Sequence, residues 1–200
     1  MSNGDERDAV ESAIRAHLAG GELAPAATLA LRSYGPAILA YLFGVLRDAS
    51  LAEEVFGDFS EQLWRGIGTF RGEGTFRAWS YGIAWHTALR AIRDPYRRRG
   101  RPLETKEVIA VVDEIRTATP FHLRTEGKDA IEALRQSLEP DERALLILRL
   151  ERKLSWAEVA RALCEEDASP PSEAALRKRF ERIKAKLREL AERQGLLAPR

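Results

Sequence analysis

The sequence contains few of the side chains on which disulfides and metal sites depend. Its 200 residues include one cysteine, Cys164, and three histidines. A single cysteine cannot form an internal disulfide, and no group of His, Cys, Asp and Glu residues has the spacing of a metal site. We therefore expect no metal, and we predict that Cys164 is a small apolar residue buried in the core.

Signals for membranes and for catalysis are missing as well. The N-terminal residues are polar and lack the apolar segment of a signal peptide. No apolar run approaches the roughly 18 residues of a membrane span. No nucleophile, base and metal constellation is present. We expect a cytoplasmic protein that does not insert into membranes, is not an enzyme, has no catalytic residue and binds no cofactor.

No strand is predicted in any part of the sequence. Apolar residues recur at three- and four-residue spacing along most of the chain, and no segment alternates apolar and polar residues as a half-buried strand does. Pro36 lies within one predicted helix and is expected to kink or break it at Gly35. The predicted fold class is all-α, with helices over 5–19, 24–47, 51–67, 128–138, 140–152, 156–164 and 173–193 and a further helix at the start of 75–101.

The composition of the chain changes between residues 100 and 127. Glycine, proline and threonine interrupt this stretch, and only 105–116 shows a helical pattern. A connection of this length is unusual within one compact domain and common between two. We predict two small helical domains, 1–99 and 128–200, joined by a linker over 100–127.

Charges of opposite sign are segregated along the chain, although the net charge is only +1. Residues 48–62 carry five acidic side chains and no lysine or arginine, whereas residues 177–188 carry seven basic side chains and one acid. The near-neutral total argues against a protein that coats DNA. The local asymmetry indicates separate surfaces for separate partners.

Most of the acidic segment lies within the predicted helix 51–67. Its apolar positions form one face, and Glu53, Glu54 and Asp58 fall outside that face. Most helices of this kind simply turn their acids to water. The alternative is that the acids dock a basic partner.

Residues 75–101 combine aromatic rings with arginines. Helical spacing places Phe76, Trp79, Ile83 and Thr87 on one face and Tyr81, Trp85, Ala88 and Ile92 on a second face, which then needs a partner. Rings that stack on bases, beside guanidinium groups that pair with phosphates, suit single-stranded nucleic acid. The alternative is a helix buried on two sides and followed by a solvated basic tail. In the first interpretation the contacting residues are Trp79, Trp85, His86, Arg90, Arg93 and Arg97.

The last two predicted helices are separated by a polar turn. Ser155 caps the first of them, and Glu158 completes a capping box. The second has a leucine-rich stripe, with basic residues on the remaining circumference. This is a helix-turn-helix pattern, which suits the major groove of DNA, although a bundle helix with a solvated basic face has the same pattern. The candidate DNA contacts are Ser172, Arg177, Lys178, Arg179 and Arg182.

Two blocks of the sequence together carry a family resemblance. The first includes Tyr34-Gly35-Pro36-Ala37-Ile38, Ala52-Glu53-Glu54-Val55-Phe56, Leu63-Trp64, Phe76-Arg77-Ala78-Trp79 and Ile83-Ala84. The second includes Leu138-Glu139-Pro140, Leu154-Ser155-Trp156-Ala157-Glu158-Val159-Ala160 and Leu176-Arg177-Lys178-Arg179-Phe180. In this order, and across a linker of this length, the blocks resemble bacterial RNA polymerase sigma factors of the extracytoplasmic-function type.

The resemblance implies a protein that lends promoter specificity to core RNA polymerase. It implies that Glu53, Glu54 and Asp58 dock the polymerase clamp, that the 79–97 residues bind the melted minus-ten element, and that the helix-turn-helix reads the minus-thirty-five element. Core RNA polymerase and promoter DNA are the expected partners, and an anti-sigma factor is a usual further partner in this family. The alternative function is a stand-alone helix-turn-helix regulator that binds DNA as a dimer.

Overall fold

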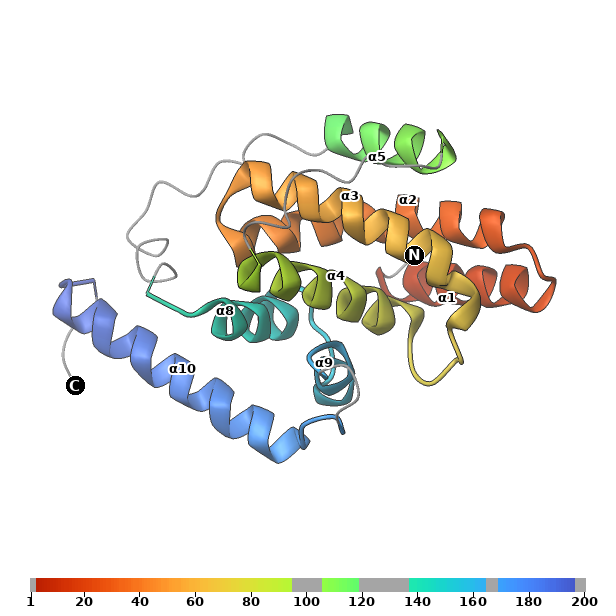
Figure 1. Cartoon of the computed structure of the whole chain (residues 1–200). Coiled ribbons are helices and arrows are strands. Elements are labelled where there is room, and N and C mark those ends of the chain that lie inside the picture. The colour runs from red at the N-terminus through yellow and green to blue at the C-terminus, as the bar shows by residue number, and fades with distance from the viewer. Residues whose placement is uncertain (1–2, 95–105, 119–136, 165–168, 197–200) are drawn as a thin grey trace.

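The computed structural model of the protein describes residues 3–94, 106–118, 137–164 and 169–196. Every regular element within these ranges is helical, which confirms the all-α fold class (Figure 1). Arg97, nearly all of the predicted helix 128–138 and parts of the predicted linker lie outside the described residues. The elements are α1 (Asn3–Ala19), α2 (Leu23–Leu46), α3 (Ala49–Gly66), η1 (Ile67–Thr69), α4 (Phe76–Arg93), α5 (Lys106–Ala118), α8 (Pro140–Leu146), η3 (Ile147–Glu151), α9 (Trp156–Ala162) and α10 (Glu173–Arg193).

Helix α2 is the central helix of the fold. It packs against α1, α3, α4, α5 and α8. It continues through Pro36 without a break, because packing on several sides outweighs the hydrogen bond that proline removes. Gly35 gives space to a neighbouring helix, since a Cβ there would lie 2.6 Å from Cδ1 of Ile115 in α5.

By length and composition alone, α2 is apolar enough to cross a membrane, with a mean hydropathy of 1.4 over its most apolar window. However, 56% of that window is buried inside the bundle. The central helix of a globular fold passes the same test, so we interpret α2 as the core helix of this bundle.

Helix α3 follows its predicted pattern. Asp48 caps its N-terminus by accepting a hydrogen bond from the Leu51 N–H (2.9 Å). The apolar residues Val55, Phe59 and Leu63 are buried against α2 and α4. Glu53, Glu54 and Asp58 lie outside this buried face, as the sequence predicts, but each is half-buried and not fully exposed to water.

Helix α4 is covered on more than one side. It packs against α1, α2, α3 and α9, and the aromatic residues Phe76, Tyr81 and Trp85 are each at most 5% exposed. The Tyr81 ring meets the ring of Tyr41 from α2 edge to face, with centroids 5.3 Å apart. The structure thus favours the alternative of a helix buried on two sides.

Helix α5 lies within the predicted linker and packs on α2 and α3. Arg116 reaches across and donates a hydrogen bond to the backbone oxygen of Glu53 (2.6 Å). This part of the linker is therefore attached to the N-terminal bundle. Its buried apolar residues, at the positions that the helical pattern selects, are Val108, Val111, Val112 and Ile115.

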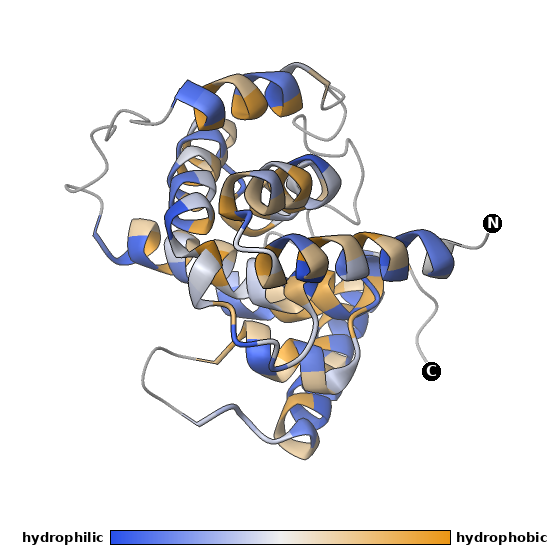
Figure 2. Ribbon diagram, turned by 90° about the vertical axis from the view of Figure 1, so that its right-hand side faces the viewer, coloured by the Kyte–Doolittle hydropathy of each residue, from blue (hydrophilic) through white to orange (hydrophobic). Residues whose placement is uncertain are grey.

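Helices α8, α9 and α10 form a second layer, below α4 in Figure 1. The predicted helix 140–152 is divided into α8 and the π-helical η3, while α10 has the predicted range 173–193. The capping box between Ser155 and Glu158 is present at the start of α9. Figure 2 shows that helices of both layers carry hydrophilic residues on one side and hydrophobic residues on another.

The two layers share buried residues. A Cβ at Gly44 of α2 would lie 2.7 Å from Cδ1 of Ile147 in η3. Nε of Arg143 in α8 donates a hydrogen bond to the backbone oxygen of Val45 in α2 (2.8 Å). One continuous apolar cluster extends from Ile14 in α1 to Ile183 in α10. The division into two domains stays a prediction, because a shared cluster does not tell whether either part folds alone.

Tyr41 provides a test of this packing. Its side chain is fully buried, burial raises the pKa of its hydroxyl well above the usual value, and the hydroxyl has no hydrogen-bond partner among the described residues. Tyr41→Phe removes a buried, unsatisfied group and is expected to raise the free energy of unfolding by about 1 kcal/mol in urea denaturation. The matched control is Tyr34→Phe, which removes a hydroxyl that donates to Glu11 Oε1 (3.0 Å) and should cost about 1 kcal/mol. Equal destabilisation by both variants would contradict the conclusion that the Tyr41 hydroxyl lacks a hydrogen-bond partner.

Candidate nucleic-acid interface

A short loop leads from η1 into α4 and shapes the start of the candidate site. Gly72 and Gly74 have φ of +76° and +98°, a backbone region that favours glycine. Thr75 then caps α4 by accepting a hydrogen bond from the Ala78 N–H (3.2 Å). The loop 70–75 is thereby folded back against the first turn of α4.

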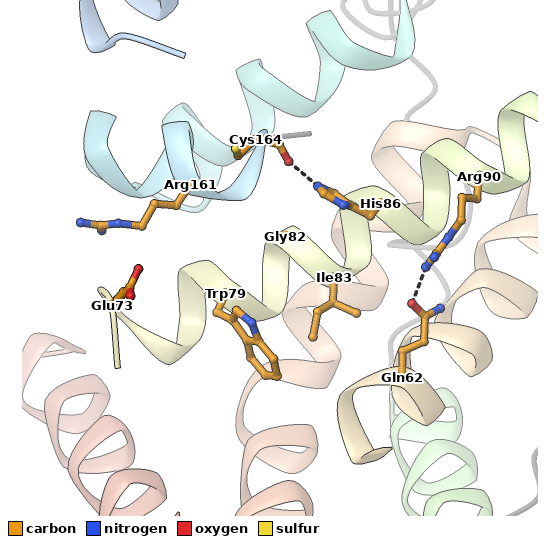
Figure 3. Close-up of a pocket in the computed structure, with 9 residues that line it drawn as sticks. All are labelled: Gln62, Glu73, Trp79, Gly82, Ile83, His86, Arg90, Arg161 and Cys164. Carbon is orange, nitrogen blue, oxygen red and sulfur yellow. Dashed lines mark hydrogen bonds between the residues drawn. The ribbon is translucent and has the colours of Figure 1, made fainter. Parts of the chain in front are cut away.

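A pocket of about 310 Å³ opens beside α4, between α3 and α9 (Figure 3). This volume is at the lower end of the roughly 300–1,000 Å³ typical of small-molecule sites. Arg161 of α9 and Cys164, just beyond α9, line the side opposite α4. The loop, α3 and α4 contribute Glu73, Gln62, Trp79, Ile83, His86 and Arg90.

Trp79 belongs to an aromatic cluster and to the pocket at once. Its ring centroid lies 5.5 Å from that of Phe70 and 5.1 Å from that of Phe76. The side chain is half-buried and lines the pocket together with Ile83. Trp79 thus provides an aromatic wall that neighbouring rings hold in place.

The polar groups of the pocket are held by hydrogen bonds. His86 Nε2 donates to the backbone oxygen of Cys164 (2.5 Å), and since a carbonyl only accepts, Nε2 carries a proton. Arg90 donates to Oε1 of Gln62, and Gln62 Nε2 donates to Thr87 Oγ1 (3.0 Å). An amide, an imidazole and a guanidinium group beside an aromatic wall can recognise the edge and face of a base.

The structure does not place all predicted residues of α4 in the pocket. Trp85 is only 5% exposed and packs within the core, so its prediction as a nucleic-acid contact is wrong for this arrangement. The reason is that the second aromatic face of α4 finds its partner inside the protein. Arg93 is exposed at the end of α4, and Arg97 lies outside the described residues.

Helix α9 and the turn before it lie directly on the first half of α4. Thr75 Oγ1 donates to Glu158 Oε1 (2.8 Å), and the Arg77 guanidinium donates to the backbone oxygen of Arg152. A Cβ at Gly82 would lie 3.7 Å from Cα of Ala162. The side of α4 that carries the pocket is therefore partly covered by the second layer.

The acidic residues of α3 lie on a helix that also packs against α5. Glu53, Glu54 and Asp58 are all half-buried, and Glu54 and Asp58 are one helical turn apart. The hydrogen bond from Arg116 of α5 is accepted by the backbone oxygen of Glu53. Their predicted role in docking a basic partner remains a prediction.

The candidate DNA-reading residues lie near the start of α10. Ser172 caps the helix by accepting from the Ala175 N–H (3.2 Å), while Lys178 and Arg182 are exposed. Arg177 donates to Glu173 Oε2 (2.8 Å), and its guanidinium carbon lies 5.6 Å from the ring centroid of Trp156.

Arg179 differs from the other basic residues of α10. It is half-buried and forms an ion pair with Asp141 of α8. The pKa of its guanidinium is lowered, mainly by burial and to a smaller extent by the nearby positive charge of Arg182. Because this pair joins α10 to α8, Arg179 has a structural role here. The structure therefore does not favour the predicted phosphate contact.

Comparison with known families concerns the part of the chain that holds the pocket. Residues 30–99 match the family model of sigma-70 region 2, a range that includes most of α2 and all of α3, the loop and α4. No curated protein matches the chain in sequence. The match supports a relationship to the sigma-70 family in this segment of an all-helical protein.

Sequence reasoning missed several residues of the pocket. Gln62 on α3 and Arg161 on α9 lie 99 positions apart, and only the packing of α9 against α4 brings them to one cavity. No local pattern marks either residue. Glu73 lies in the loop between η1 and α4, and no sequence pattern marks it either.

The contact between α9 and α4 is expected to weaken in acid. Burial opposes ionisation of Glu158, but hydrogen bonds from the Ser155 N–H, the Ser155 hydroxyl and the Thr75 hydroxyl outweigh it and lower the pKa below the ordinary 4.5. A depressed pKa stabilises the folded protein at pH above 4.5, and this contribution is lost as pH falls through the lower folded value. Glu158→Gln should therefore flatten the pH dependence of unfolding between about pH 5 and 3. An unchanged pH profile in urea denaturation would refute this role of Glu158.

Proposed function

We propose that this protein is a sigma factor that binds core RNA polymerase and directs transcription initiation at specific promoters. The match of residues 30–99 to sigma-70 region 2 carries the proposal, because that domain type supports interaction with the polymerase and with promoter DNA. Such a protein performs no catalysis of its own and acts in the cytoplasm, where the polymerase works. The extracytoplasmic-function type, and an anti-sigma partner, are proposed from the resemblance of the two sequence blocks.

The acidic side of α3 is the proposed polymerase-docking surface. Glu53, Glu54 and Asp58 lie on a helix that has no lysine or arginine before Arg65. Half-buried carboxylates gain more from a basic partner than fully solvated ones, since water screens them less. Charge complementarity with basic clamp helices would orient the front of the molecule on the polymerase.

The pocket beside α4 is the proposed site for an unpaired base of the opened promoter. Removing a base from the stack costs a few kcal/mol, and stacking on an aromatic ring returns roughly 1–3 kcal/mol. Trp79 supplies the ring, and Gln62, His86 and Arg90 supply groups that can bond to base edges. Arg93 is exposed at the end of α4, which supports its proposed contact with the phosphate backbone.

The helices α9 and α10 are proposed to form the helix-turn-helix that reads duplex DNA upstream. Lys178, Arg182 and the capped start at Ser172 face solvent on the first turns of α10. In this motif the start of the second helix approaches base edges in the major groove. Arg177 adds a guanidinium group that Glu173 and Trp156 hold in place.

Transcription with purified core polymerase tests the proposal. On a library of promoters from the same genome, the protein should make the polymerase start at defined sites. The variant Glu53→Lys with Asp58→Lys should lose both copurification with the polymerase and initiation, because it reverses two charges of the docking surface. The matched control, Glu6→Lys with Asp8→Lys, makes the same charge change at exposed positions of α1 and should keep both activities.

Failure of the wild-type protein to direct initiation at any site would refute the proposal. Binding of naked palindromic DNA by a dimer, without polymerase, would instead support a stand-alone regulator. Initiation that survives the charge reversal would reject only the docking surface.

The cover that α9 forms over α4 must also open if the pocket is to admit a strand. In a Cys164→Ser background, Gly82→Cys with Ala162→Cys places one cysteine on each helix at a point of contact, where the Gly82 Cβ position lies 3.7 Å from Ala162 Cα, so that oxidation can link the helices by a disulfide. The oxidised variant is expected to lose at least about tenfold in open-complex formation, since one crosslink blocks strand entry to the base-capture pocket. A reducing agent should restore activity, and each single cysteine variant should be unaffected by oxidation. Full activity of the oxidised, crosslinked protein would show that α9 stays on α4 during initiation.

A further inference from the structure

The start of α4 is held by a residue from outside the matched segment. Glu11 of α1 accepts hydrogen bonds from the backbone N–H groups of Phe76 (2.8 Å, to Oε2) and Arg77 (2.8 Å, to Oε1). These are the first two residues of α4, whose N–H groups have no acceptor within the helix. Oε1 of Glu11 also accepts from the Tyr34 hydroxyl (3.0 Å), which ties the carboxylate to α2. A negative charge at this position additionally complements the helix dipole of α4.

A second side chain of α1 holds the loop itself. Arg15 lies one helical turn after Glu11 and donates a hydrogen bond from Nη2 to the backbone oxygen of Gly74 (2.6 Å). Its guanidinium carbon lies 5.8 Å from the ring centroid of Phe70. The loop 70–75 is thus attached to α1 near both of its ends.

The loop and the start of α4 in turn set the walls of the pocket. Glu73 lines the pocket, and the rings of Phe70 and Phe76 pack against the ring of Trp79. A movement of the loop would therefore displace the aromatic wall and Glu73 together. Gly72 and Gly74 leave the loop backbone free to move unless other groups hold it.

We propose that Glu11 and Arg15 are positioning residues of the pocket beside α4. They fix the loop 70–75 and thereby determine which base the pocket accepts. This inference rests on the proposed function. It extends the functional unit beyond residues 30–99, because both residues belong to α1. Neither side chain lines the pocket, so each acts through the loop and through Trp79.

A purely structural role for α1 gives a different expectation. Ile14 of α1 is fully buried in the core, so α1 also contributes to packing. If packing were its whole contribution, any variant of α1 with the same melting temperature would bind the strand equally well. A positioning role instead predicts an effect on base preference that melting temperature does not explain.

The test uses holoenzyme assembled from core polymerase and the full-length chain. The probe is a fluorescent single-stranded oligonucleotide that carries the non-template minus-ten sequence of a promoter on which the wild-type protein initiates. A set of related oligonucleotides varies one base at a time. The ratio of affinities between the preferred and the substituted base, at the position where wild type discriminates most, is the measured quantity.

Glu11→Ala and Arg15→Ala are expected to reduce that ratio about tenfold, the scale of one lost base contact, while affinity for core polymerase stays at the wild-type value. Arg15→Lys retains a donor for the Gly74 oxygen and should recover part of the ratio. The matched control is Ile14→Val, which lowers stability from the same helix but leaves both contacts to the loop and should keep the wild-type ratio. Arg15 is exposed, so Arg15→Ala provides a folded variant even if Glu11→Ala does not fold.

The outcomes separate the two proposals. If wild type discriminates and both alanine variants do so equally well, the positioning role is wrong and the proposed function stands. If Ile14→Val loses the ratio as much as Arg15→Ala does, general destabilisation explains the effect and the positioning role is again wrong. If wild-type holoenzyme neither initiates nor discriminates, the proposed function fails and the inference fails with it.

Discussion

Enclosure of α4 is the constraint on which the candidate site depends. Tyr81, Trp85 and Ala88 anchor one stripe of this helix in the core, and the stripe beside it carries Trp79, Ile83, His86 and Arg90 into the pocket. Helical geometry links the two stripes rigidly, so burial of the first fixes the direction of the second. Because interiors are densely packed, the side of α4 that lines the pocket keeps its direction without needing a ligand.

Hydrogen bonds at the start of α4 complete this enclosure from two directions. Glu11 reaches it from α1, and Glu158 reaches it from α9 through Thr75. The two carboxylates differ in what they do, since the first satisfies backbone groups of α4 and the second links two helix caps. One contact can therefore persist while the other separates, which is compatible with a second layer that leaves α4 when a strand enters.

Local sequence signals predicted much of the fold. The range of α10, the Ser155 cap and the apolar positions of α5 follow from capping chemistry and helical periodicity, which act over a few residues. The predicted break at Pro36 does not occur, because neighbours on several sides hold α2 together. Residues 106–118 are assigned to a linker because glycine, proline and threonine interrupt the neighbouring sequence. The sequence does not indicate that α5 packs onto α2 and α3.

The sequence by itself determined that a helix with two apolar faces lies at the start of 75–101 and that arginines accompany it. Only the tertiary structure decided that residues of both faces are buried and where the pocket opens beside them. The face predicted to need a partner holds Tyr81 and Trp85 in the core. The other face is divided, since Phe76 and Thr87 are buried while Trp79 and Ile83 line a pocket. The physical reason is that periodicity records which residues share a side of a helix, while burial depends on neighbours such as α2 and α9 that are distant in sequence.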